Sequence, residues 1–173
     1  MTTSPQVRQV ETLRFGQVAV ESNAIIEFVR PILGFEHLKE FALFDHDEES
    51  PFKWLQSLED ASLAFVVTNP TLFGLTYEFH LPSDACELLA IQSAEEAQVL
   101  TIVTIPDEVP AHMTANLLAP IVFHNDSRQA MQIVIDNDAD LYSTKVRLIP
   151  DQVIKADGLI DLDLLTQHIN KAD

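Results

Sequence analysis

The chain has 173 residues, of which 47% are apolar and 21% charged, the composition of a globular domain rather than of a disordered chain. Ten Lys and Arg stand against 27 Asp and Glu, a formal charge of −17. This charge disfavours direct binding of nucleic acid, because phosphate backbones are bound by Lys and Arg. The single cysteine, Cys86, excludes an internal disulfide and a multi-thiolate metal site, and is typical of a reducing compartment.

No segment approaches the ~18 unbroken apolar residues of a membrane span. The first sixteen residues also lack the apolar core of a secretion signal. We therefore expect a cytoplasmic protein that neither crosses a membrane nor contacts one.

Short runs rich in Val, Ile, Phe and Thr recur along the chain between Pro, Asn, Asp and Gly, which is typical of β-strands. Gly16 and the segment 124–127 have the composition of tight turns between strands. Pro120 removes a backbone donor, so its strand should lie at an edge or carry a bulge. The expected strands are Leu13–Phe15, Gln17–Val20, Ile25–Val29, Glu40–Phe44, Phe52–Ser57, Leu63–Thr68, Thr76–Leu81, Val99–Ile105, Leu117–His124 and Ala130–Ile135.

Two segments have helical patterns. Ser83–Leu89 would be a short helix between strands, and from Asp161 onward Leu162, Leu165 and Ile169 follow a helical spacing. The terminal helix would either pack its apolar stripe on the domain or act as an arm that docks on a partner. The sequence therefore predicts a mainly β fold with short helices: a small antiparallel β-barrel-like or curved sandwich domain over residues 1–150, and a C-terminal helical extension over residues 151–173.

Catalytic patterns are missing from the sequence. Four glycines are too few for a phosphate-binding loop or a dinucleotide fingerprint, and no serine lies in a G-x-S-x-G elbow. Cys86 has no context that would lower its pKa, so a buried and inert thiol is expected. The six histidines show no local metal-ligand spacing. We predict that the protein is not an enzyme and holds no cofactor or metal.

One acidic segment imitates a calcium loop. Asp136, Asp138 and Asp140 match its opening, but Leu141 occupies the glycine position and Arg147 the final glutamate position. A solvated acidic turn is therefore expected.

The negative charge is unevenly distributed. Residues 54–127 contain no Lys or Arg and ten acids, and Asp45, Asp47, Glu48 and Glu49 form a further cluster on a predicted loop. Such a surface could serve solubility alone. It could also steer a basic protein partner and raise its association rate, because no cations neutralise the carboxylates locally.

Several strings in the sequence occur together in a known family. The longest string, T-A-N-L-L-A-P, spans Thr114–Pro120. Six others accompany it: T-I-V-T at 101–104, S-P-F at 50–52, L-Q-S at 55–57, L-A-F-V-V-T at 63–68, Y-E-F at 77–79 and G-F-E at 34–36. With these motifs the chain resembles the flagellar assembly factor FliW family from about Phe15 to Tyr142. It departs from the family at 28–34, where a P-x-G-I-P-G turn is frequent, and in the tail after about Arg147, which is longer than usual.

The resemblance implies a non-enzymatic cytoplasmic regulator of flagellum biogenesis. FliW-like proteins bind flagellin before its export, and they bind the translational repressor CsrA, which relieves repression of flagellin synthesis. An anionic protein that repels RNA is a sensible antagonist of a basic RNA-binding protein. Charge alone does not decide whether it covers the RNA surface or acts from a neighbouring site. The alternatives are a flagellin-binding chaperone without a regulatory role and a small metal-dependent β-barrel enzyme.

The candidate partner-binding residues fall into three groups. The acidic cluster would meet a basic partner, and an apolar patch of Leu72, Phe73 and Leu75 would meet the amphipathic end of flagellin, unless these side chains belong to the core. Asn116 would either satisfy backbone groups beside Pro120 or mark an edge that accepts a partner strand. The residues proposed are Asp45, Asp47, Glu48, Glu49, Leu72, Phe73 and Asn116.

Overall fold

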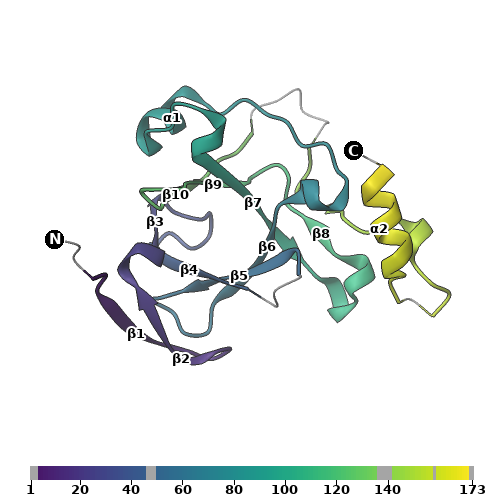
Figure 1. Cartoon of the computed structure of the whole chain (residues 1–173), viewed down its shortest axis with the longest axis horizontal. Coiled ribbons are helices and arrows are strands. Elements are labelled where there is room, and N and C mark those ends of the chain that lie inside the picture. Colours follow the sequence, from purple (N-terminus) through teal and green to yellow (C-terminus); the bar gives the residue numbers. More distant parts are fainter. Residues whose placement is uncertain (1–3, 46–49, 136–141, 158, 172–173) are drawn as a thin grey trace.

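The computed structural model describes residues 4–45, 50–135, 142–157 and 159–171. Most of the regular structure in the described chain is β-strand, and short helical turns and loops join the strands (Figure 1). The strands are β1 (Val7–Thr12), β2 (Gly16–Glu21), β3 (Ile26–Arg30), β4 (Glu40–Asp45), β5 (Phe52–Ser57), β6 (Ala64–Thr68), β7 (Ala97–Thr104), β8 (Thr114–Ala115), β9 (Ile121–His124), β10 (Gln129–Gln132) and β11 (Val146–Arg147). The α-helices are α1 (Ser83–Leu89) and α2 (Leu162–Lys171), and the 3₁₀ turns are η1 (Ser22–Ala24), η2 (Pro70–Phe73), η3 (Ala94–Glu96), η4 (Pro106–Glu108), η5 (Pro110–His112) and η6 (Asp151–Val153).

Seven of the described strands close into a barrel in the order β7-β6-β5-β4-β3-β10-β9, and β9 returns to pair with β7. Sequential strands pair antiparallel, as expected, while β10 and β3 pair in parallel. The prediction of a mainly β, barrel-like domain is confirmed, and of the two expected architectures the barrel is the one observed. Closure gives most strands a neighbour on both sides, which protects their backbone groups from unwanted pairing.

The barrel is filled by apolar side chains that point inward from alternate strand positions. Phe28 and Phe41 pack edge to face with ring centroids 5.1 Å apart, and Leu55 and Phe123 are almost fully buried beside them. Each such side chain contributes roughly 1.5–3 kcal/mol by leaving water. The inward positions are the apolar ones of the sequence pattern, so the pattern fixes which face of each strand is buried.

A separate hairpin, β1–β2, lies against the outside of the barrel at β4 and β5. Its register pairs Thr12 with Gly16, and Gly16 has φ of 69°, a conformation that a glycine adopts at little cost. The prediction of a strand at Leu13–Phe15 is wrong, because these residues form the loop of the hairpin and the strand precedes them. At the loop the Arg14 guanidinium lies 3.8 Å from the centre of the Trp54 ring.

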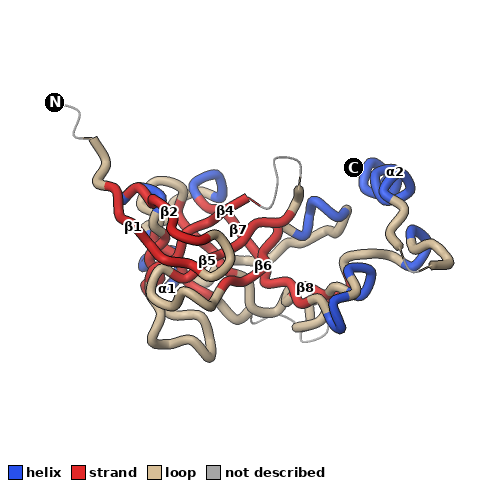
Figure 2. Tube along the Cα trace, turned by 90° about the horizontal axis from the view of Figure 1, so that it is seen from below, coloured by secondary structure: helices blue, strands red, loops and turns tan. Residues whose placement is uncertain are grey.

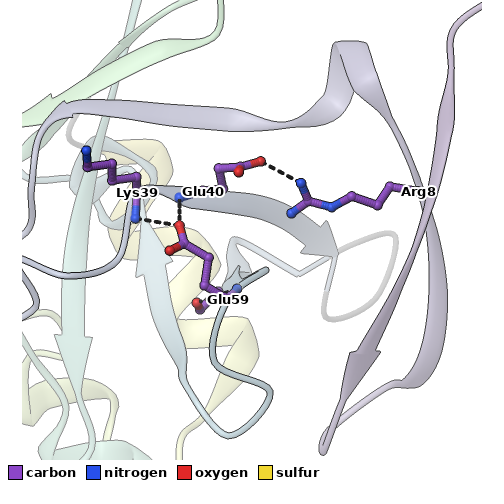
Figure 3. A network of polar contacts seen from close by, with 5 residues as sticks. Arg8, Lys39, Glu40 and Glu59 are labelled. Atoms are coloured by element: carbon purple, nitrogen blue, oxygen red, sulfur yellow. Dashed lines mark hydrogen bonds and ion pairs between the residues drawn. The ribbon is translucent and has the colours of Figure 1, made fainter.

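Carboxylates fasten this hairpin to the barrel (Figure 3). Glu59 Oε1 accepts hydrogen bonds from the backbone N–H groups of Lys39 and Glu40, at 2.8 and 2.7 Å. The Glu40 side chain in turn lies 2.8 Å from Arg8 Nη1 on β1. One carboxylate thus holds the start of β4, and the neighbouring one holds the hairpin.

Two further strand predictions need correction. Residues 76–81 carry the predicted alternation but form no strand, because they cross the barrel surface without a neighbouring ladder. The predicted strand at Leu117–His124 begins only at Ile121, so Pro120 precedes the strand and causes neither an edge nor a bulge. Its carbonyl accepts a hydrogen bond from Ile133 N at 3.0 Å, and β9 is paired on both sides.

Both predicted helices are present, and they lie on different parts of the molecule (Figure 2). Helix α1 packs Ala85 and Leu89 against Val122 and Met131 of the barrel. Helix α2 lies at the end of the molecule remote from the β1–β2 hairpin and contributes Leu165 to a second apolar cluster, which includes Phe73 and Val153. This cluster joins residues from both sides of position 150; the domain boundary drawn there stays a prediction.

The apolar stripe of α2 is only partly used. Leu165 packs, whereas Leu162 is 70% exposed. No helix within the described ranges is both long and apolar enough to span a bilayer.

The Glu59 carboxylate can be tested by substitution. Glu59→Ala removes two charge-assisted hydrogen bonds from backbone donors at the start of β4 that water can still reach, so we expect a loss of about 1–2 kcal/mol in the free energy of unfolding. Arg8→Ala removes only an exposed ion pair and should cost less than about 1 kcal/mol. Urea unfolding of both variants measures the difference, and equal costs would contradict this assignment.

The docking of α2 can be tested in the same way. Leu165→Ala should lower the free energy of unfolding by about 1–2 kcal/mol, since Leu165 is partly buried in the second cluster. Leu162→Ala, one turn earlier and exposed, is the matched control and should change it by less than about 0.5 kcal/mol. If neither substitution alters the thermal midpoint, the helix does not stabilise the domain.

Candidate partner-binding surface

The acidic cluster is only partly described by the structure. Asp45 ends β4 with its side chain exposed, and its Oδ1 lies 2.6 Å from Lys53 Nζ on β5. Asp47, Glu48 and Glu49 lie outside the described residues. Because the Asp45–Lys53 pair is exposed, it contributes little to stability, and the role of the cluster in partner binding stays a prediction.

The structure separates Leu72 from Phe73, which were predicted to form one patch. Both lie in η2, where Asn69 Oδ1 accepts a hydrogen bond from Thr71 N and Gly74 ends the turn with φ of 78°. The Phe73 ring is buried, 5.4 Å from that of Phe52, whereas Leu72 is 50% exposed. The tight turn directs adjacent side chains in different directions, so only Leu72 is placed to meet a partner.

Asn116 has a structural role. Its Oδ1 accepts a hydrogen bond from Ala119 N at 3.1 Å, and its backbone N–H donates to Ile102 O at 2.9 Å. The side chain therefore holds the turn before Pro120, which agrees with the structural interpretation of this residue. The backbone N–H of Asn116 is already bonded to β7, so a partner strand could not pair with it.

Two adjoining cavities flank the side chains of Tyr77 and Phe79, which lie in the Y-E-F motif but were not among the predicted partner-binding residues. One has a volume of about 470 Å³ and lies between β7 and η2, and the other, of about 430 Å³, lies between β7 and α1. Both are lined by Tyr77, Phe79, Ala97 and Val99. We call this surface the β7 groove. The sequence signal for this surface was the alternation of apolar and polar residues over 76–81. Here the alternation belongs to a segment whose aromatic side chains cover the barrel wall, and not to a strand.

Tyr77 fixes one wall of the β7 groove. Its hydroxyl donates to Leu117 O at 2.6 Å, and its ring packs edge to face with that of Tyr142 at 4.9 Å. Tyr142 in turn holds the backbone of Glu78, accepting from its N–H and donating to its carbonyl. The pKa of Tyr77 is raised above its usual value, mainly because the hydroxyl is buried and to a smaller extent because Tyr142 lies beside it.

Other chemically capable residues do not gather into a site. Within the described ranges no group of three or more His, Cys, Asp and Glu side chains could hold a metal ion. Cys86 is half-buried at the edge of the β7 groove rather than fully buried as expected, and its Sγ lies 3.9 Å from Leu81 O. His124 Nδ1 accepts hydrogen bonds from Asp126 N and Ser127 N and so shapes the predicted β9–β10 turn. Asp136, Asp138 and Asp140 lie outside the described residues.

Tyr77 generates a prediction about pH. The pKa of the Tyr77 hydroxyl is higher in the folded protein than in the unfolded chain. Its contribution to the free energy of unfolding is therefore complete below about pH 10 and is lost as the pH rises toward the folded-state pKa. Tyr77→Phe should cost on the order of 1 kcal/mol at neutral pH through the lost hydrogen bond. It should also reduce the fall in unfolding free energy between about pH 9 and about pH 11. Tyr142→Phe keeps Tyr77 and should retain that fall, measured by urea unfolding at each pH.

Comparison with known proteins places this fold in one family. The family model described as FliW protein matches residues 9–148. The chain is 37% identical over 137 residues to a flagellar assembly factor FliW of Alkaliphilus metalliredigens, covering 79% of this chain and 83% of that protein. It is 38% identical over 138 residues to one of Leptospira interrogans, with 80% and 92% covered.

A solved structure agrees with these matches. The crystal structure of the flagellar assembly factor FliW superposes with a TM-score of 0.74 at 32% sequence identity, covering 84% of this chain and all of that one. The motifs T-A-N-L-L-A-P and L-A-F-V-V-T, which suggested the resemblance, lie inside the matched range. The chain therefore belongs to the FliW family of flagellar assembly factors.

Proposed function

We propose that this protein works without catalysis in flagellar assembly, as a cytoplasmic regulator that binds both flagellin and the translational repressor CsrA. Binding of CsrA would prevent it from repressing flagellin synthesis, and secretion of flagellin would free the protein to bind CsrA. The family membership supports the assignment to flagellar assembly. The two partners come from what the family resemblance implies.

The observation that carries the proposal is the one-sided charge of the central chain. From Trp54 to Ser127 no cation interrupts ten acids, and these residues build β6, β7, β9 and the segments between them. A protein that holds RNA must present basic residues, so a chain with this excess of negative charge would attract it and repel the RNA that it carries. Hydrogen bonds lower the pKa of two of these acids: backbone N–H groups of Gln92 and Ser93 lower that of Glu96, and Arg30, which forms an exposed ion pair with Asp84, lowers that of Asp84.

Binding to CsrA tests the proposal directly. Purified protein and the CsrA of the same bacterium should elute together in size-exclusion chromatography at low salt. Raising the salt from about 50 mM to about 500 mM should weaken the affinity about tenfold or more, because the Debye length shortens. A gel shift then separates the regulator from the chaperone: the protein should release CsrA from flagellin mRNA. Binding of flagellin without any effect on CsrA would favour the pure chaperone and contradict the proposal.

The acidic cluster can be tested against a matched control. Reversal of its four residues to Lys should slow association with CsrA about tenfold at low salt without unfolding the domain, because steering depends on local charge. A control with the same change in net charge should slow it by no more than about threefold. The cluster variant changes Asp45, Asp47, Glu48 and Glu49, and the control changes Glu11, Glu21, Glu27 and Asp151. Equal association rates in stopped flow would show that only net charge matters.

A further inference from the structure

The backbone of β7 uses its two edges differently. Glu96 O, just before the strand, accepts a hydrogen bond from Asn125 N at 2.8 Å, and Ile102 O accepts one from Asn116 N at 2.9 Å. Both bonds lie on the side of β7 that pairs with β9 and β8. Because backbone groups of successive residues in a strand face opposite edges, the even-numbered residues of β7 face β9 and the odd-numbered ones face β6.

The ladder with β6 covers only half of the opposite edge. Its registered pairs are Val66 with Val103, Val67 with Ile102, and Thr68 with Thr101. The next odd residue, Val99, would stand opposite Pro70, which has no N–H and begins η2. The backbone groups of Val99 and Ala97 therefore face away from β9 at a place where β6 has already left the sheet.

The β7 groove lies against this half-edge. Its larger cavity is lined by residues 97–100 on one side and by Asn69, Thr71 and Leu72 on the other. Leu72 is half exposed there, and Tyr77 and Phe79 form an aromatic wall. Natural sheets normally cover or charge such an edge, because unpaired backbone groups beside apolar side chains are a template for a further strand.

The charge around the β7 groove selects the kind of partner. Lys53 is the one Lys or Arg among the described residues that line the two cavities, and its ammonium group is paired with Asp45. Glu78 lines the smaller cavity, and Glu95 and Glu96 directly precede β7. An extended segment with a Lys or Arg beside an apolar residue fits this combination of apolar walls and acidic rim.

We propose that the β7 groove binds an extended segment of a basic protein partner, which adds a strand to β7 at Ala97 and Val99 and places an apolar side chain against Leu72. Strand addition supplies affinity through backbone hydrogen bonds and specificity through pockets for alternate side chains. The proposal rests on the proposed function for the choice of probe, which is CsrA.

Amide hydrogen exchange of the ¹⁵N-labelled full chain, followed by NMR with and without CsrA, tests the register. The amides of Ala97 and Val99 should exchange at least about tenfold more slowly in the complex. Those of Gln98 and Leu100 should change little, because they already bond to β9. If CsrA binds and the two odd amides are not protected, the inference is wrong and the proposed function stands. If CsrA does not bind at all, the proposed function fails first. Protection by flagellin alone would overturn the choice of a basic partner.

Substitutions at Leu72 test the groove independently. Leu72→Arg should weaken CsrA binding about tenfold or more, since it removes the apolar contact and repels a basic segment, while Leu72→Glu should weaken it less. Leu88→Arg is the matched control: Leu88 is 45% exposed on α1 and lines neither cavity, so its change should alter the affinity less than about twofold. Thermal midpoints should remain unchanged. Equal effects of Leu72→Arg and Leu88→Arg would overturn the proposal.

Discussion

Closure of the barrel is the constraint on which the rest of this structure depends. The chain reaches closure through β10, which pairs in parallel with β3 on one side and antiparallel with β9 on the other, before β9 meets β7. The β10–β3 and β9–β7 contacts join segments far apart in the sequence, so the core forms only when the ends of the sheet meet. The buried Phe and Leu side chains supply the free energy, and the paired edges remove the backbone groups that would otherwise be unsatisfied.

The same constraint explains where the protein has surface left for binding. A barrel of short strands covers most of its edges, but β7 is longer than its neighbour β6. The β6–β7 ladder stops at Thr68 and Thr101, just before Pro70, so the first half of β7 has no partner on that edge. What remains is a short edge beside apolar side chains, in a region of the chain without cations. The proposed binding surface thus combines a gap in the hydrogen-bond ladder of β7 with a stretch of chain, residues 54–127, that contains no Lys or Arg.

Much of the fold could be read from local patterns, and the errors share a cause. Phe52–Ser57 was predicted with the observed bounds, since its alternation and flanking turn residues coincide. Residues 76–81 have a similar alternation but no strand beside them, and a pattern cannot report whether a neighbour exists. β1 was missed because its polar residues face outward on a hairpin that packs through few side chains, among them Val10. Of the candidate site, Leu72 was found and Tyr77 and Val99 were not.

The sequence by itself determined the mainly β class, the two helices, the absence of familiar catalytic motifs, the acidic surface and, through its motifs, the family. These properties depend on residue type and on short spacings, which are local. Only the tertiary structure decided that the sheet closes into a barrel, that Phe73 is buried while Leu72 is exposed, and that half an edge of β7 is left without β6. Those outcomes depend on which distant segments become neighbours, because burial and hydrogen-bond pairing are properties of the assembled chain.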